Sequence, residues 1–185
     1  MTVLSSVMQF AMLPLQGLGQ GAQPIISYNY GAKNAERVKK AFRLLLTASL
    51  CYSVTLWALV MAVPQAFVMM FNTNEALVSY TIPALRIYLG ALLLFGIQVA
   101  CQMTFTSMGN ALASVIVAVV RKFVLLLPLI YIMPLIFTAD KATAVFMAEP
   151  VADTIAVLFT AILFFFQFRR FMSKMNAADK EKTNT

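Results

Sequence analysis

The chain has 185 residues, of which 61% are hydrophobic and 11% charged, a composition that excludes an ordinary soluble domain. Its net charge of +7 could suit nucleic acid, but the basic residues gather at the ends of apolar stretches, as an orientation signal does in membrane proteins. A transmembrane barrel is excluded too, because it needs alternating segments of about ten residues, which the sequence lacks.

Five apolar stretches are each long enough to cross a bilayer core, which requires roughly 20 helical residues. We therefore predict an all-α, polytopic membrane protein, with a membrane domain over residues 1–170. The predicted spans lie near 3–27, 44–70, 84–107, 112–137 and 150–168, the last one starting at Pro150. The polar residues 171–185 are predicted to form a disordered cytoplasmic tail.

Polar side chains follow one side of the first predicted span. At about 100° per residue they point within roughly 60° of one another, and they continue the same stripe to the end of the span. These residues are Gln9, Gln16, Gln20, Gln23 and Ser27. Amides that face lipid would leave donors and acceptors unsatisfied, so the stripe must face inward. It either bonds to neighbouring helices or lines a hydrated cavity, and we favour the cavity because packing needs fewer polar groups.

Two further features accompany this span. Gly17 and Gly21 form a GxxxG pattern on an adjacent face, which permits another helix to approach closely. The connection that follows is rich in positive charge, as is the segment after the fifth span. The basic residues are Lys33, Arg37, Lys39, Lys40 and Arg43, then Arg169, Arg170, Lys174, Lys180 and Lys182.

The positive-inside rule places both basic segments, and hence the C-terminus, in the cytoplasm. With five spans, the N-terminal end then lies outside, although nothing before the first span is basic. We therefore expect the chain to continue a longer protein that has at least one preceding helix.

The third predicted span repeats the amide pattern more weakly. Gln98 and Gln102 are one turn apart, and Phe95 and Phe105 lie near them on that face. Amides beside aromatic rings suit an amphipathic or cationic organic molecule, since ring faces attract cations. The alternative is that both amides bond to a neighbouring helix. We predict that Gln98, Gln102 and Phe105 join the first-span stripe in lining a substrate cavity.

Few charged groups fall within the spans. Arg121 could snorkel to the inner surface, and Asp153 could cap the start of the fifth helix, but both are candidates for an ion or polar role. The sequence has no histidine, and Cys51 and Cys101 are fifty residues apart and suit buried packing. We predict no metal site, no catalytic site and no enzymatic activity.

The run from Gln23 to Ala32, QPIISYNYGA, precedes the first basic segment. It resembles a stretch that closes the eighth transmembrane helix in the multidrug and toxin extrusion (MATE) family, and most of all in its MepA-type bacterial branch. Arg121 followed by Pro128 is similar to a family pattern in helix eleven. The residues carrying the motif are Pro24, Tyr28, Asn29, Tyr30 and Gly31, and Gly31 is expected to allow the tight inner turn.

The resemblance implies that the spans are helices eight to twelve of a twelve-helix transporter in the bacterial plasma (inner) membrane. Family members export organic cations and other drugs by proton or sodium antiport, rocking two six-helix lobes. It implies no cofactor, a coupling ion held by a preceding N-terminal lobe, membrane lipids as partners and no nucleic acid. The alternatives are a truncated, non-transporting membrane protein, or a flippase for lipid-linked sugars from the same superfamily.

Overall fold

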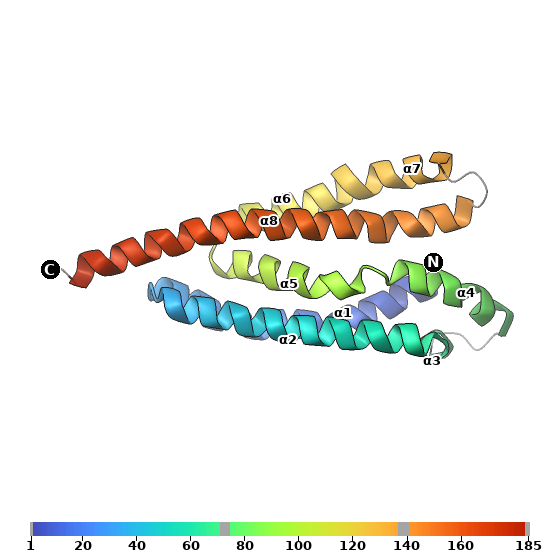
Figure 1. Ribbon diagram of the computed structural model, residues 1–185, viewed down its shortest axis with the longest axis horizontal. Coiled ribbons are helices and arrows are strands. Elements are labelled where there is room, and N and C mark those ends of the chain that lie inside the picture. Colours follow the sequence, from blue (N-terminus) through green and yellow to red (C-terminus); the bar gives the residue numbers. More distant parts are fainter. Residues whose placement is uncertain (1, 71–74, 137–140, 184–185) are drawn as a thin grey trace.

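The computed structural model describes residues 2–70, 75–136 and 141–183, and every element within them is helical (Figure 1). In chain order the elements are α1 (Thr2–Gly31), α2 (Ala35–Ala62), α3 (Pro64–Met69), α4 (Glu75–Tyr88), α5 (Leu92–Ser107), α6 (Ala111–Val119), the π-helix η1 (Val120–Leu126), α7 (Leu127–Ile136) and α8 (Lys141–Thr183). The predicted all-α fold is confirmed.

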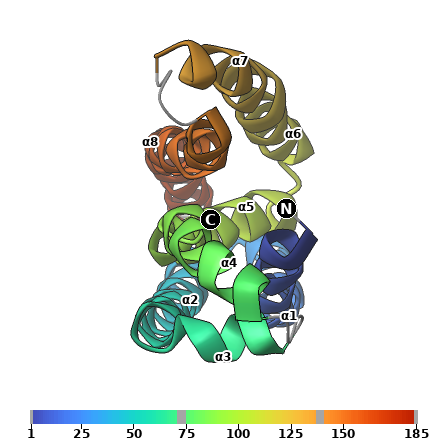
Figure 2. The ribbon, with the colours of Figure 1, turned by 90° about the vertical axis from the view of Figure 1, so that its right-hand side faces the viewer.

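The helices lie side by side along one long direction (Figure 1). Seen end-on, α1 and α2 form one edge, α4 and α5 lie in the middle, α8 follows, and α6 to α7 form the other edge (Figure 2). The α5 helix contacts α1, α2 and α8, so it is the centre of the packing. Both the α1–α2 and the α5–α6 turns lie toward the end of the molecule that carries the C-terminal part of α8 (Figure 1).

Four helical stretches are long and apolar enough to cross a membrane by length and composition. They are Ala35–Ala62, Thr81–Ser107, Leu112–Met133 and Met147–Met175. The 30-residue α1 is long enough but falls outside this set, since its glutamines lower its mean hydropathy. It packs against α2 and α5 all the same, so it belongs to the same bundle.

Two of the predicted spans are broken in the structure. The second one changes from α2 to α3 at Val63, because Pro64 has no N–H and therefore starts a new helix at its first position. The third one combines the end of α4 with α5, and the amide of Gly90 bonds to the Ile87 carbonyl at the break (3.1 Å). These breaks could not be placed from hydropathy alone.

The fifth predicted span differs at both ends. The α8 helix begins at Lys141, so Pro150 lies inside it and does not start it. The predicted disordered tail is helical as far as Thr183. Apolar residues at helical spacing, Phe168, Met172 and Met175, keep α8 packed against the bundle as far as Met175, beyond the end of the predicted span.

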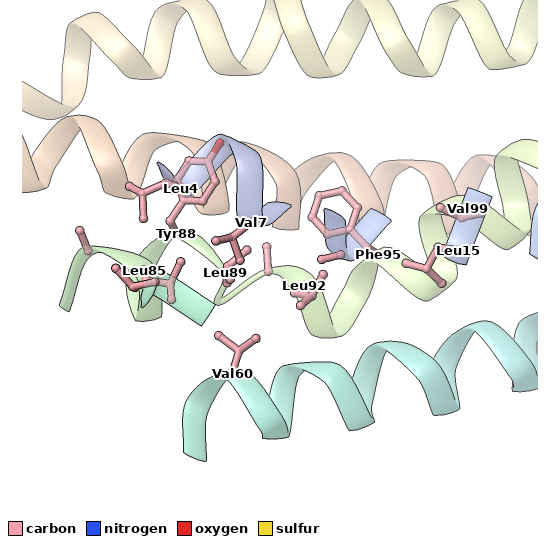
Figure 3. Close-up of a cluster of buried hydrophobic side chains, with 14 of the residues drawn as sticks. Leu4, Val7, Leu15, Val60, Leu85, Tyr88, Leu89, Leu92, Phe95 and Val99 are labelled. Atoms are coloured by element: carbon pink, nitrogen blue, oxygen red, sulfur yellow. The ribbon is translucent and has the colours of Figure 1, made fainter. Parts of the chain in front are cut away.

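The apolar core has two parts. One part joins α1, α2, α4 and α5 around Leu15, Val60, Leu85 and Phe95, which are almost fully buried (Figure 3). The second part lies toward the turns and is built on aromatic rings: Phe105 packs edge-to-face on Phe164, with ring centroids 5.1 Å apart. Together they hold α5 between its neighbours, and this fixes the direction of its polar face.

Glycine allows α5 to approach α2 closely at one point. A Cβ on Gly96 would lie 2.7 Å from the carbonyl oxygen of Ser49, too near for any larger residue. By contrast, Gly17 and Gly21 have nothing within 4 Å of their Cβ positions. The GxxxG pattern therefore makes no close helix contact within the described parts of the chain. Gly96, which no sequence pattern indicated, makes one.

The α1–α2 turn ends its first helix with a left-handed residue. The amide of Asn34 donates to the Asn29 carbonyl (2.9 Å), and Lys33 between them has φ 59°. The Asn34 side chain then caps α2 by accepting from the Arg37 amide (3.0 Å). Gly31 was expected to allow this turn, but it is the last residue of α1, and the left-handed position falls on Lys33.

The α5–α6 turn repeats this geometry. The amide of Asn110 donates to the Phe105 carbonyl (2.9 Å), and the residue before it, Gly109, has φ 74°. Asn110 also caps α6 by accepting from the Ala113 amide (3.3 Å). The two turns therefore use the same motif, a left-handed residue followed by a capping asparagine.

Candidate functional site

A hollow of about 700 Å³ lies between α1, α5, α6 and η1. Its walls mix amides and hydroxyls with methionine, valine and phenylalanine side chains. The lining residues are Met12, Gln16, Gln20, Gln23, Phe95, Gln98, Val99, Gln102, Met103, Thr106, Ser114 and Arg121. We call this hollow the glutamine cavity, because five of its lining residues are glutamines from two different helices.

The α1 helix supplies three of these glutamines. Gln16, Gln20 and Gln23 are spaced by four and three residues, so they lie on one face of α1. Gln16 and Gln20 are exposed and Gln23 is half-buried. The apolar residues Ala11 and Leu15 on α1 are buried in the core, which fixes the rotation of the helix and turns the amides toward the hollow.

The α5 helix supplies the other two. Gln98 is 4% exposed, and its side-chain oxygen has no hydrogen-bond donor among the described residues. Gln102 donates to the Ser114 hydroxyl (3.3 Å) and so connects α5 to α6. A buried acceptor without a donor costs about 1–3 kcal/mol of stability. The side-chain oxygen of Gln98 is therefore available to accept a hydrogen bond from a ligand.

One charged residue lines the hollow. Arg121 lies on η1, and its Nε donates to a side-chain oxygen of Asp153 on α8 at 2.6 Å. Its guanidinium also stands over the ring of Phe95 at 5.1 Å from the centroid. Arg121 is 26% exposed at its side chain, whereas Asp153 is 4% exposed. Arg121 therefore lines the hollow, and the buried carboxylate of Asp153 holds the guanidinium in place from the α8 side.

This pair replaces two sequence-based interpretations. Arg121 does not snorkel away from the bundle, because Asp153 holds it against the wall of the cavity. Asp153 does not cap a helix start, because α8 begins twelve residues earlier at Lys141.

Arg121 lies on the only π-helical segment in the described residues. Such segments widen the helix by one residue and often occur at functional sites. In this chain the π-helical segment contacts α8, and its Arg121 also contacts Phe95 of α5.

Three predicted cavity residues do not line the hollow. Gln9 is exposed on α1 and lies nearer the N-terminal end of this helix than the lining residues do. Ser27 donates to the Ser107 carbonyl (2.9 Å) and joins α1 to α5 near the two turns. Phe105 is fully buried in the aromatic cluster with Phe164 and is not among the residues that line the hollow. Helical spacing alone could not separate these positions from their neighbours.

The motif residues at the end of α1 have different surroundings. Pro24 and Tyr28 are exposed. Asn29 is buried, and its side-chain amide donates to the Ile25 carbonyl (2.7 Å). The Tyr30 ring packs edge-to-face on Phe171 of α8, 6.2 Å between centroids. Part of the motif therefore packs against the C-terminal half of α8, and part of it is exposed.

Several lining residues were not predicted. Thr106 follows Gln98 and Gln102 at intervals of four, so the same helical spacing could have found it. Ser114, Met12 and Met103 gave no such signal, because their place in the lining depends on how α1, α5 and α6 pack against one another. Among the described residues, no three histidine, cysteine or acidic side chains group in a way that could hold a metal ion.

Comparison with known proteins gives a consistent result. The family model described as MatE matches residues 1–132. The Multidrug export protein MepA of Staphylococcus aureus is 26% identical over 131 residues, which are 71% of this chain and 29% of the relative. MepA of Staphylococcus haemolyticus is 23% identical over 163 residues, 88% of this chain and 35% of the relative. The chain thus spans about a third of the length of these curated relatives.

Solved structures agree. The MATE multidrug transporter DinF-BH, solved in complex with rhodamine 6G, is 30% identical, with a TM-score of 0.77 over 86% of this chain and 35% of that chain. A MATE crystal structure in the bent conformation has a TM-score of 0.85 over 95% of this chain and 38% of that chain. At 15% identity, this second structure shows a shared fold alone.

Proposed function

The chain belongs to the MatE family of membrane transporters, and we propose that it forms most of one six-helix lobe of a multidrug efflux antiporter. In this proposal the glutamine cavity supplies one wall of the central substrate cavity. The family is one of transporters and not of enzymes. Proton or sodium coupling would rest on groups outside this wall.

The observation that carries the proposal is the unpaired acceptor of Gln98. It lies buried in the wall of a hollow that four more glutamines line. Amides both donate and accept, so such a wall suits ligands of varied hydrogen-bonding pattern. Met12 and Met103 beside them are flexible and polarisable, which suits substrates of varied shape.

The charges of the wall bear on the substrate. Arg121 and Asp153 form a pair without net charge, and the Phe95 ring already contacts the guanidinium. An organic cation would therefore find amides and apolar surface on this side, but no free carboxylate among the lining residues. We propose that the opposite lobe supplies the countercharge for a cationic substrate, as well as the site for the coupling ion.

The orientation follows from charge. The α1–α2 turn and the C-terminal part of α8 lie toward the same end of the molecule (Figure 1), and both are rich in lysine and arginine. The positive-inside rule makes this end cytoplasmic. We propose a multi-pass protein of the bacterial plasma membrane with a cytoplasmic C-terminus.

Dye binding tests the cavity. Rhodamine 6G fluorescence polarisation with the purified chain in nanodiscs would compare Gln98→Leu with Gln65→Leu, an exposed glutamine on α3 outside the cavity. We expect Gln98→Leu to weaken binding about tenfold, since one hydrogen bond to a buried group is lost. Gln65→Leu should leave it unchanged. Equal effects of the two substitutions would contradict the proposal.

Efflux tests the division between two lobes. Cells that express only this chain should fail to export ethidium, because one wall of the cavity and the coupling site would be supplied by another lobe. Energy-dependent export by the 185-residue chain alone would refute this part of the proposal.

A further inference from the structure

A second hollow lies on the other side of α1, between α1 and α2. It measures about 990 Å³ and is mostly apolar. Gly17 and Gly21 contribute to its lining without filling it, since nothing lies within 4 Å of their Cβ positions. Its sides include the exposed side chains of Ile25 and Leu44. We call it the α1–α2 groove.

The groove is charged at one end only. Its two charged lining residues are Arg37 and Lys40, three residues apart on α2 and hence on one helix face. Lys40 also borders a smaller hollow of about 490 Å³, whose other lining residues are Glu36, Lys39 and Arg43. The apolar groove therefore leads toward a cluster of four cations and one carboxylate.

The cations lie at the cytoplasmic end of α2, within the turns that follow its first residue Ala35. In a membrane this is the level of the inner-leaflet headgroups, whose negative potential attracts lysine and arginine. The rest of the groove runs along the two helices toward Pro14 and Tyr52, at the depth of the acyl chains.

We propose that the α1–α2 groove binds an anionic phospholipid of the inner leaflet. One acyl chain lies over Gly17 and Gly21, and the phosphate lies between Arg37 and Lys40. Arginine and lysine both bind phosphate oxygens through charge-assisted hydrogen bonds. The small glycines leave room for the chain, and Ile25 and Leu44 flank it.

The charges favour a lipid over a packed helix. A lipid combines an apolar chain with an anionic group at the level where the groove becomes basic, so a single ligand matches both parts. A helix seated in the groove would have to bring its own acidic groups to the headgroup level. The proposal needs only the membrane orientation and not the transport activity, so a failure of one leaves the other standing.

Native mass spectrometry of the full chain tests the proposal. The protein would be released from detergent micelles after incubation with equal amounts of phosphatidylglycerol and phosphatidylcholine. We expect one phosphatidylglycerol to be retained in preference. In Arg37→Gln with Lys40→Gln its apparent affinity should fall roughly tenfold to thirtyfold. The control, Arg170→Gln with Lys174→Gln, removes two exposed charges of α8 outside the groove and should retain it.

A second variant keeps the charges and fills the groove. Gly17→Leu with Gly21→Leu places side chains into open space, so folding should be preserved, and lipid retention should fall as in the charge variant. Ala58→Leu, exposed on α2 outside the groove, should have no effect. Equal retention of the two lipids, or retention unaffected by the groove-filling pair, would overturn the proposal and favour a helix as the occupant.

Discussion

Arg121 and Asp153 meet between η1 and α8, with Nε 2.6 Å from a carboxylate oxygen. Both residues lie in helical stretches that are long and apolar enough to cross a membrane, where an unpaired charge is costly. The pair lets a cation take part in the wall of a cavity that is otherwise neutral. It also joins the α6–α7 edge of the bundle to α8, on which this edge mainly packs.

Breaking this pair should cost stability. Asp153→Asn leaves the Arg121 guanidinium without its carboxylate, and we expect a loss of about 2–4 kcal/mol, below the full value for buried pairs because Arg121 is partly exposed. Thermal unfolding in detergent, followed by the fluorescence of Trp57, measures it. The double variant Arg121→Gln with Asp153→Asn removes both charges and should recover part of the loss. The single variant Arg121→Gln completes the cycle, and a double variant whose loss equals the sum of the two single losses would contradict a direct interaction.

Gly96 should tolerate no side chain. In Gly96→Ala the new Cβ would lie 2.7 Å from the Ser49 carbonyl, so α5 and α2 must separate. We expect a loss of about 1–3 kcal/mol in the same unfolding experiment. The matched control Gly17→Ala meets open space and should be neutral or slightly stabilising, since alanine favours helix. Equal effects of the two would show that the close approach at Gly96 is absent.

Replacing Lys33 with glycine should stabilise the protein. It has a left-handed backbone, which disfavours residues with a Cβ by about 1 kcal/mol, and the equivalent position of the α5–α6 turn is Gly109. Lys33→Gly should therefore raise the free energy of unfolding by up to about 1 kcal/mol. Asn34→Ala should lower it by about 1 kcal/mol through loss of the α2 cap. A destabilised Lys33→Gly would argue against the turn geometry.

A substitution at Phe105 should affect the packing of the bundle but not the binding of dye. Its ring is buried against Phe164 and does not line the glutamine cavity. Phe105→Ala should lower stability by about 2–4 kcal/mol but leave rhodamine 6G affinity unchanged at temperatures where the protein is folded. Gln98→Leu should show the opposite profile. A folded Phe105→Ala variant that binds the dye weakly would show that Phe105 contributes to the substrate cavity after all.

The sequence predicted those features that depend on one helix at a time. The all-α fold follows from the apolar stretches, and the stripe of Gln16, Gln20 and Gln23 follows from the 3.6-residue period. The α5 pair Gln98 and Gln102 was found by the same spacing. In the structure these five amides line one hollow.

Features that depend on two elements could not be predicted in this way. Nothing in the spacing of Arg121 and Asp153, 32 residues apart, indicates that they meet. The direction of Phe105 depends on where α8 packs, and the close approach at Gly96 depends on Ser49 of α2. The helical end of α8 was missed because its charged residues hid the apolar face formed by Phe168, Met172 and Met175.

The central claim is that the glutamine face of α1 borders a hydrated cavity, and cysteine labelling tests it most directly. In a background with Cys51→Ala and Cys101→Ala, a charged, water-soluble thiol reagent would be applied to Gln20→Cys and Leu18→Cys in membranes. The two positions lie at similar depth on α1, but only Gln20 lines the glutamine cavity. Because the thiolate that reacts forms only in contact with water, we predict that Gln20→Cys is labelled at least roughly tenfold faster. Equal rates at the two positions would contradict the account.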